Sequence, residues 1–249
     1  MRPSVYISDH PHSRIVGNAF AEGCEGRVLP PLKLLDGPAA VYGILRGCDG
    51  IVRECEWVGR DYYHIDHGYF RRGHYDGYYR VSRNGLQCKP NGEGSDGERW
   101  KSLDLEIEPW RKAGRDIVVA PMSKAVGTFL GINTWRWTEA VVKEIALHTD
   151  RPVVIKPKGE GDLDKALADA WCLVTHASNA AVDALRMGIP VVVLGASAVA
   201  QCGWTLQNIE EPHWWPDREK LFSVLADNQW TLEEMRDGTC WRTFDATGS

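Results

Sequence analysis

The chain has 249 residues, enough for one large domain or two small ones that each bury a core. Its hydrophobic content of 43% and its charged content of 25% are ordinary for a soluble globular protein. The formal net charge of −5 argues against a surface coated with basic residues for non-specific nucleic-acid binding, although it does not exclude a local basic face.

The cysteines and the N-terminus bear on the cellular compartment. Seven cysteines stand singly, with no CxxC pair, at Cys24, Cys48, Cys55, Cys88, Cys172, Cys202 and Cys240. This pattern fits neither a disulfide framework nor a zinc site, and an odd number suits free thiols in a reducing cytoplasm. The first residues contain no apolar signal segment, and no run approaches the roughly 18 apolar residues that span a bilayer. We therefore expect a cytoplasmic protein with no membrane partner, located in the host cytoplasm if it is viral.

The N-terminal part alternates short apolar runs with amphipathic segments. We expect strands at 5–8, 26–29, 39–45 and 62–65, and helices at 13–22, closed by Gly23, and at 49–57. This rhythm predicts a small parallel sheet. Asp9, His10 and His12 follow the first strand and are interpreted as a polar turn, with the alternative that they reach a ligand site.

The segment 61–85 leads from an aromatic strand into a loop rich in Tyr, His and Arg, with a break at Gly68. Chemistry in α/β proteins is placed at such strand ends. Asp66 and His67 lie at the break and are candidates for a general base, because a carboxylate or an imidazole can accept a proton. Rings and guanidinium groups suit stacking and anion binding, and we predict acceptor contacts from Tyr69, Arg71, Arg72, His74 and Arg80. The alternative is a solvated basic surface loop.

Residues 87–101 are rich in Gly, Pro and charge, which predicts a loop or linker. Beyond it we expect strands at 116–120, 152–155, 172–175 and 190–195, and helices at 137–148, 163–171, 179–187, 217–225 and 232–237. Short connections in this β-α-β alternation argue for a doubly wound half. We therefore expect an N-terminal domain at 1–110 and a C-terminal domain at 111–249.

Polar residues follow several strands of the second half. A Ser or Asn at the start of a helix, with free backbone N–H groups, favours an anion there. Ligands of open α/β sheets bind at the carboxyl ends of strands. We predict a donor phosphate site formed by Ser123, Lys156, Lys158, Thr175, His176, Ser178 and Asn179. The alternative is a capping serine with two solvated lysines.

The strand that ends at Thr175, the following ASNAAVDALRMGIPVVVLG and the later GWT resemble the donor-binding half of GT-B glycosyltransferases. The similarity is greatest to capsule polysaccharide transferases of the Kdo-transferring type. Matching positions are Thr175, Ser178, Asn179, Ala184, Leu185, Gly188, Pro190, Val191, Gly203 and Trp204. The segment DHGYFR at 66–71 matches the family's E/D-x-G-F/Y-x-R pattern. One departure is Lys156-Pro157-Lys158, which stands where the family has Lys-Pro-His-Pro, a turn that touches nucleotide phosphate.

The resemblance implies two Rossmann-like halves of GT-B type with a cleft between them, and a metal-independent transferase with a nucleotide sugar as donor and no cofactor. Small enzymes of this kind in tailed phages glycosylate hydroxymethylated bases of viral DNA. We therefore expect a glycosyltransferase that modifies an acceptor hydroxyl, with a DNA base as the preferred acceptor and DNA as partner. Alternatives are a capsule polysaccharide transferase, a non-catalytic nucleotide-sugar-binding module and an epimerase-like enzyme.

Overall fold

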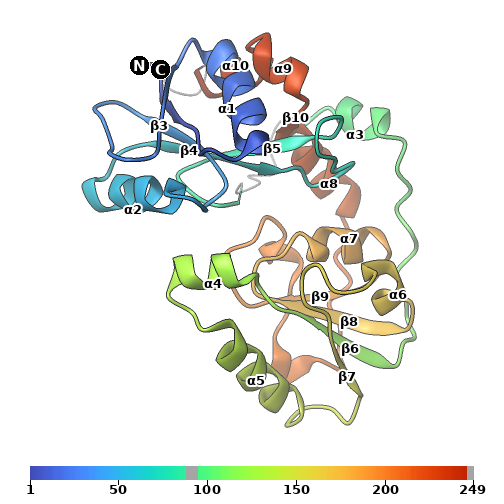
Figure 1. Ribbon diagram of the computed structural model, residues 1–249. Helices are drawn as coiled ribbons and strands as arrows, with labels where there is room; N and C mark the ends of the chain where they lie inside the picture. Colours follow the sequence, from blue (N-terminus) through green and yellow to red (C-terminus); the bar gives the residue numbers. More distant parts are fainter. Residues whose placement is uncertain (88–94, 246–249) are drawn as a thin grey trace. The chain divides into compact units, whose positions relative to one another are not determined.

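The computed structural model describes residues 1–87 and 95–245, which fold into two compact α/β units (Figure 1). The first unit joins Met1–Cys88 to Leu225–Ser249, and the second is Lys89–Val224. This division differs from the expected domains 1–110 and 111–249. The physical reason is that the last part of the chain adds a strand and two helices to the first unit.

The sheet of the first unit has six strands in the order β10-β5-β4-β3-β1-β2. Their bounds are β1 Ser4–Tyr6, β2 Arg27–Leu29, β3 Ala39–Tyr42, β4 Tyr62–His67, β5 Tyr79–Arg83 and β10 Gln229–Trp230. β1 pairs in parallel with β2 and β3, and β3 pairs in parallel with β4. The carboxyl ends of these four strands therefore meet at one edge of the sheet.

Helices α1 (Pro11–Cys24) and α2 (Cys48–Val58) connect the parallel strands. The prediction that Gly23 closes the first helix is wrong, because α1 runs on to Cys24 and is capped by Glu25 at φ 50°. Gly23 has a packing role instead. A Cβ atom there would lie 1.8 Å from the carbonyl oxygen of Met235, so the glycine lets helix α9 (Leu232–Arg236) approach α1.

Strand β5 lies where the sequence predicts a continuous loop. It pairs antiparallel with β4, so that Asp66 is opposite Arg80 and His67 is opposite Tyr79. Arg80 and Ser82 of β5 are buried and bonded to protein groups; Ser82 Oγ, for example, donates to the carbonyl oxygen of Gly85 at 2.7 Å. Because these residues are polar, the strand lacks the alternation of apolar and polar residues by which a half-buried strand is recognised in a sequence.

The C-terminal segment completes the core of the first unit. β10 pairs antiparallel with β5, and α9 and α10 (Thr239–Asp245) pack against α1. Trp241 of α10 meets Phe20 and Tyr63 edge-on, with ring centroids 6.1 and 5.2 Å apart. These aromatic contacts attach the end of the chain to the first unit.

The sheet of the second unit has four parallel strands in the order β7-β6-β8-β9, as the β-α-β pattern predicts. Their bounds are β6 Asp116–Ala120, β7 Val153–Ile155, β8 Ala170–Thr175 and β9 Val191–Val193. Ile117, Val119 and Val174 are fully buried in its core. Parallel strands of this kind carry continuous apolar runs, which explains why the sequence identifies them.

The remaining helices lie between β5 and β10 in the sequence. Their bounds are α3 Glu98–Ser102, α4 Lys124–Leu130, α5 Thr134–Ile145, α6 Leu163–Leu167, α7 Ala180–Arg186 and α8 Arg218–Asp227, with short 3₁₀ turns at Ala200–Cys202 and Leu206–Asn208. The sequence does not predict α4, which starts where Ser123 Oγ accepts the N–H of Val126 at 3.3 Å. Within the predicted linker, residues 88–94 lie outside the described part of the chain, whereas α3 begins at Glu98.

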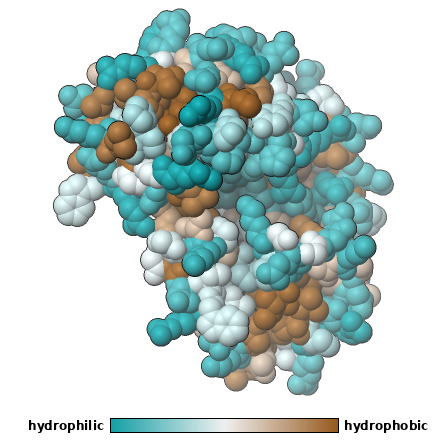
Figure 2. All heavy atoms as spheres, in the orientation of Figure 1, coloured by the Kyte–Doolittle hydropathy of each residue, from teal (hydrophilic) through white to brown (hydrophobic). Residues whose placement is uncertain are grey.

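The face of the molecule in Figure 2 is mostly polar, and the cysteines among the described residues are buried. Among residues 1–87 and 95–245, no helix has the length and apolar character needed to cross a membrane. Figure 2 shows a mostly hydrophilic face with apolar patches on both units; exposed apolar residues include Val28 and Leu32 in the first unit and Leu147 and Ile155 in the second. Six cysteines are buried free thiols, and Cys88 lies outside the described residues.

Two glycines with the same backbone angle allow a direct test of packing in the second unit. Gly188 and Gly131 both have φ +70°, but a Cβ atom on Gly188 would lie 2.0 Å from the carbonyl oxygen of Pro109, whereas nothing lies within 4 Å of one on Gly131. We expect Gly131→Ala to destabilise the fold by about 1 kcal/mol and Gly188→Ala by roughly 3 kcal/mol or more. Urea unfolding measures both, and equal losses would contradict the close approach of Pro109.

Candidate functional site

In the first unit, polar and aromatic side chains gather at the carboxyl edge of the parallel strands. His12 lies in the first turn of α1 after β1, Tyr42 ends β3 and His67 ends β4. This edge is where α/β proteins bind ligands. The sequence predicts the contribution of β4, offers that of His12 only as an alternative, and does not predict that of Tyr42.

An ion pair fixes the end of β4. Asp66 Oδ2 accepts a hydrogen bond from Arg80 Nη2 at 2.8 Å, and Asp66 Oδ1 accepts the backbone N–H of His67 at 2.8 Å. Arg80 Nη1 also donates to the carbonyl oxygen of His67 at 2.6 Å. The Arg80 side chain is 5% exposed and that of Asp66 is 37% exposed, so the carboxylate is the member of the pair that solvent reaches.

The surroundings of Asp66 decide what this carboxylate can do. Burial alone would raise the pKa of Asp66, but the Arg80 guanidinium, His64 and the backbone N–H of His67 outweigh it and hold the pKa at about 2. The carboxylate is therefore ionised at neutral pH and only weakly basic. Its predicted role as general base stays a prediction, with His67 as the rival.

Tyr69 and Arg80 lie inside the first unit rather than on an acceptor surface. Tyr69 is 0% exposed, its backbone N–H donates to Gln229 Oε1 at 2.8 Å, and the guanidinium of Arg80 lies 5.5 Å from its ring centroid. The Arg80 guanidinium is used by Asp66 and by backbone oxygens. Both residues are predicted from the sequence to contact the acceptor, but in the structure they are buried in the first unit.

The other predicted acceptor residues do reach the surface. Arg71, Arg72 and His74 are exposed on the loop between β4 and β5. The loop is closed by the N–H of Tyr78, which donates to the carbonyl oxygen of Arg71 at 3.2 Å. Their contact with an acceptor stays a prediction.

Six aromatic residues form a cluster at this edge, which we call the His–Tyr cluster. Its members are His12, Tyr42, His67, His74, Tyr75 and Tyr79, with contacting ring centroids between 5.2 and 6.4 Å apart. His12 is 5% exposed and contacts each of the other five. The sequence misses this cluster, because no local pattern links His12 to ring partners on other strands and loops.

Hydrogen bonds connect the cluster. His12 Nε2 lies 2.8 Å from Tyr79 Oη, His12 Nδ1 lies 3.3 Å from His74 Nδ1, and His67 Nε2 lies 3.4 Å from Tyr42 Oη. Burial and the neighbouring His67, His74 and His10 lower the pKa of His12. Burial raises the pKa of Tyr79 to about 12 and also raises that of Tyr42. His12, Tyr42 and Tyr79 are therefore neutral at neutral pH, and each can donate and accept a hydrogen bond.

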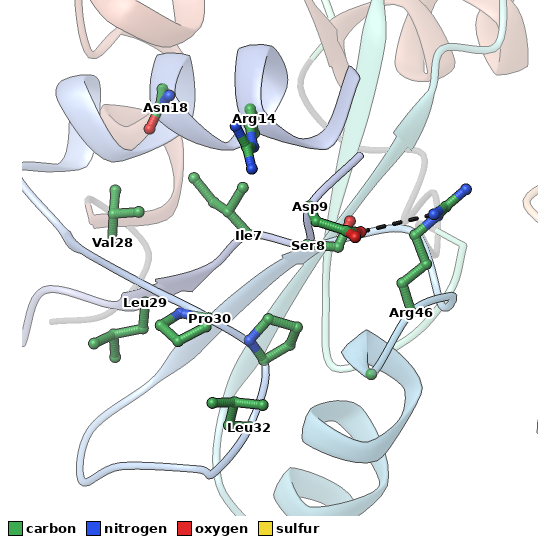
Figure 3. Close-up of a pocket in the computed structure, with 12 residues that line it drawn as sticks. Ile7, Ser8, Asp9, Arg14, Asn18, Val28, Leu29, Pro30, Leu32 and Arg46 are labelled. Atoms are coloured by element: carbon green, nitrogen blue, oxygen red, sulfur yellow. Dashed lines mark ion pairs between the residues drawn. The ribbon is translucent and has the colours of Figure 1, made fainter. Parts of the chain in front are cut away.

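A cavity of about 810 Å³ lies beside the carboxyl ends of β1 and β2 (Figure 3). Its polar lining residues are Ser8, Asp9, Arg14, Asn18 and Arg46. Arg46 Nη1 and Asp9 Oδ1 are 3.7 Å apart, and both side chains are largely exposed. The sequence interprets Asp9 as part of a polar turn, with the alternative that it reaches a ligand site, and it does not single out the other polar residues that line the cavity.

In the second unit, Thr175 and Ser178 build the turn after β8. The fully buried Thr175 Oγ1 donates to the carbonyl oxygen of Ala120 at 2.7 Å and accepts the N–H of Ser178 at 3.3 Å. Ser178 Oγ accepts the N–H of Ala180 at 3.2 Å, and the Asn179 side chain makes no capping bond to α7. Thr175 thus has a structural role, and the donor contacts predicted for this turn stay predictions.

His176 is packed tightly beside this turn. A Cβ atom on Gly195 would lie 2.2 Å from its ring, and Trp137 meets the ring edge-on with centroids 6.1 Å apart. His176 Nδ1 is buried and has no hydrogen-bond partner among residues 1–87 and 95–245. Burial lowers the pKa of His176, so the ring is neutral at neutral pH.

A cavity of about 630 Å³ lies at the carboxyl ends of β6 and β7 in the second unit. Its lining includes two predicted donor residues, Ser123 and Lys158, together with Lys124, Trp135 and Ile155, which the sequence did not single out. Lys156 follows the same strand, and its Nζ donates to the carbonyl oxygen of Pro157 at 3.1 Å. Apolar walls with ammonium groups suit a flat ring that carries phosphate.

Metal ligands were not expected. Within residues 1–87 and 95–245, no group of three or more His, Cys, Asp or Glu residues is arranged to hold a metal ion. Metal independence of the reaction stays a prediction.

Comparisons with known proteins address the fold. No protein-family model matches the sequence, and no curated protein matches it. The structure is similar to the KpsC β-Kdo 2,7 transferase of Thermosulfurimonas dismutans, with a TM-score of 0.52, 14% identity and coverage of 96% of this chain and 99% of that one. It is also similar to the KpsC β-Kdo 2,4 transferase of that organism, with a TM-score of 0.52, 11% identity and 90% coverage of each chain. The chain shares their fold. The predicted fold class, two Rossmann-like α/β halves, is thereby confirmed.

The buried His64, next to the candidate base, predicts a pH-dependent stability. It is 2% exposed, and burial, aided by the charge of Arg80, lowers its pKa from 6.5 to about 4. Neither ring nitrogen has a hydrogen-bond partner of good geometry among the described residues. Because the folded pKa is the lower one, the unfolded chain binds the proton more readily, and stability present above pH 6.5 is lost as the pH falls toward 4.

We expect this loss to be roughly 3 kcal/mol. Asp66 adds a further loss from about pH 4 to pH 2, because its pKa is also depressed on folding. Urea unfolding at several pH values tests this against His64→Leu, which cannot titrate and should lose much less stability between pH 6.5 and 4. Equal losses in the two proteins would contradict the assignment to His64.

Proposed function

We propose that the protein is a glycosyltransferase that moves a sugar from a nucleotide sugar to the hydroxyl group of an acceptor. The observation that carries this proposal is the likeness of fold to two sugar transferases over at least 90% of the chain. Cavities at the carboxyl ends of strands in each unit are consistent with it, because that edge is where such folds bind ligands.

In this proposal the cavity of the second unit holds the nucleotide. Trp135, which is 71% exposed, and Ile155 offer apolar surface for the base. Lys124 and Lys158 at the same cavity, together with the neighbouring Lys156, would stabilise the negative charge that grows on the departing phosphate. The turn at Ser178 and Asn179 remains the predicted second contact to the phosphate.

The donor site can be tested by binding. We expect Lys158→Ala to weaken binding of the cognate nucleotide about tenfold, because it removes one cation from the phosphate. Lys165→Ala is the matched control, since Lys165 is an exposed lysine of α6 in the same unit that does not line the cavity. Calorimetry with a panel of nucleotide sugars measures both, and equal affinities in the two variants would argue against this cavity as the donor site.

For the acceptor hydroxyl, Asp66 and His67 are the bases that the sequence proposes. Asp66 would instead be the nucleophile if the enzyme retains configuration at the anomeric carbon. The ion pair with Arg80 makes Asp66 a weak base, which favours His67 of these two. A non-catalytic binding module should tolerate Asp66→Ala, whereas an enzyme that uses this carboxylate should not, and an epimerase-like enzyme would convert the nucleotide sugar without any acceptor.

The acceptor that we propose is a hydroxymethylated base in DNA. Arg71 and Arg72 are exposed and can meet phosphates, and His74 offers a ring for stacking. An acidic polysaccharide is the alternative, because guanidinium groups bind its anions in the same way.

Mass spectrometry of nucleosides tests the acceptor. Hydroxymethylated DNA is incubated with the protein and a panel of nucleotide sugars, and we expect one base to gain the mass of one sugar. DNA without hydroxymethyl groups is the control. Consumption of the donor without a DNA product would move the polysaccharide or epimerase alternatives ahead.

A further inference from the structure

Three residues of the His–Tyr cluster form a hydrogen-bonded chain that ends at the surface. Tyr79 and His12 are buried, with exposures of 0% and 5%, whereas His74 is exposed on the loop between β4 and β5. His12 Nε2 meets Tyr79 Oη at 2.8 Å, and His12 Nδ1 meets His74 Nδ1 at 3.3 Å. The order from inside to outside is therefore Tyr79, His12 and His74.

The direction of each hydrogen bond in this chain follows from the bond that the Tyr79 hydroxyl makes to the backbone. The Tyr79 hydroxyl donates to the carbonyl oxygen of His74, which can only accept. Tyr79 Oη must then accept from His12 Nε2–H. Because His12 is neutral, its Nδ1 carries a lone pair and must accept from His74 Nδ1–H.

These hydrogen bonds require His74 to adopt the less common tautomer, with the proton on Nδ1 and a lone pair on Nε2. Among residues 1–87 and 95–245, no group hydrogen-bonds to His74 Nε2, and the ring is exposed. The titratable side chains that face it are His12, His67, Tyr75 and Tyr79. A base whose far nitrogen is fixed by a buried partner is the arrangement that activates a histidine in nucleophilic catalysis.

We propose that His74 takes the proton from the acceptor hydroxyl, and that His12 and Tyr79 are positioning residues that present its Nε2 lone pair. This rests on the proposed glycosyltransferase function. The hydroxyl oxygen forms the bond to the anomeric carbon, the bond from that carbon to the phosphate oxygen breaks, and the electron pair leaves with the nucleotide. The hydroxyl proton moves to His74 Nε2 and passes to solvent after the product leaves.

His74 is better placed for this step than the two bases taken from the sequence. Asp66 is ion-paired with Arg80 and weakly basic. His67 Nε2 already faces Tyr42 Oη at 3.4 Å, and the His67 ring is only partly exposed. Of the three, only His74 combines an exposed side chain with a ring nitrogen that is oriented by a chain of buried hydrogen-bond partners.

Nitrogen NMR tests the hydrogen-bond chain without any substrate. In ¹⁵N-labelled protein at a pH of about 8, where histidine is neutral, we expect His74 to be protonated on Nδ1 and His12 on Nε2. In Tyr79→Phe, which keeps the ring, His12 loses its acceptor and His74 should revert to the common Nε2–H tautomer. An Nε2–H tautomer of His74 in the unaltered protein would overturn the proposal.

Kinetics test the catalytic role. We expect His74→Gln to lower the rate of sugar transfer by roughly 100-fold or more with unchanged donor affinity, and Tyr79→Phe to lower it by about tenfold or more. Tyr75→Phe is the matched control; Tyr75 stacks on His12 with centroids 5.3 Å apart, and its hydroxyl is outside the chain. A His74→Gln variant that folds and transfers sugar at the normal rate, or a His67→Gln variant that alone is inactive, would overturn the proposal.

The NMR and kinetic experiments together distinguish a failure of this proposal from a failure of the glycosyltransferase function on which it rests. If the tautomers are as expected but the protein turns over no nucleotide sugar on any acceptor, the proposed glycosyltransferase function is wrong and the hydrogen-bonded chain is still correct. If transfer is found and the tautomers are reversed, the function stands and the assignment of His74 fails.

Discussion

The geometry of the first unit depends on the ion pair between Asp66 and Arg80. It joins β4 to β5 at the edge where ligands would bind, and Arg80 also holds the carbonyl oxygen of His67. A buried guanidinium requires a carboxylate and carbonyl partners, because an unpaired charge in the interior is strongly unfavourable. This requirement fixes the register that places His67 opposite Tyr79, and through Tyr79 it positions His12 and His74.

The two units reach a similar arrangement by different means. In the first unit, charge pairing and a cluster of histidine and tyrosine rings organise the carboxyl edge of the sheet. In the second unit, the Thr175 hydroxyl links β6 to the turn after β8, and lysines stand at the cavity. Hydrogen bonds of the buried Arg80 guanidinium and of the buried Thr175 hydroxyl hold the two edges in place, which is what preorganised binding of a ligand requires.

The sequence predicts well what is encoded locally and poorly what is encoded between distant segments. Apolar runs identify the parallel strands of the second unit, because each strand is buried on both faces. Strand β5 is missed because Arg80 and Ser82 are buried by pairing rather than by being apolar. The predicted acceptor role of Tyr69 fails for a related reason, since the ring is 0% exposed beneath Arg80. The sequence offers His12 only as an alternative ligand-site residue and does not predict its cluster, because its five ring partners come from other strands and loops.

The return of the chain to the first unit has a consequence for its synthesis. The second unit is inserted between β5 and β10, so the sheet of the first unit gains its last strand only after Lys89–Val224 has been made. Until then, the edge of β5 and the face of α1 that receives Trp241 are uncovered on the ribosome. The second unit can fold in the meantime, because its sheet is built from contiguous chain. Folding of the first unit thus waits until residues 229–245 have been synthesised.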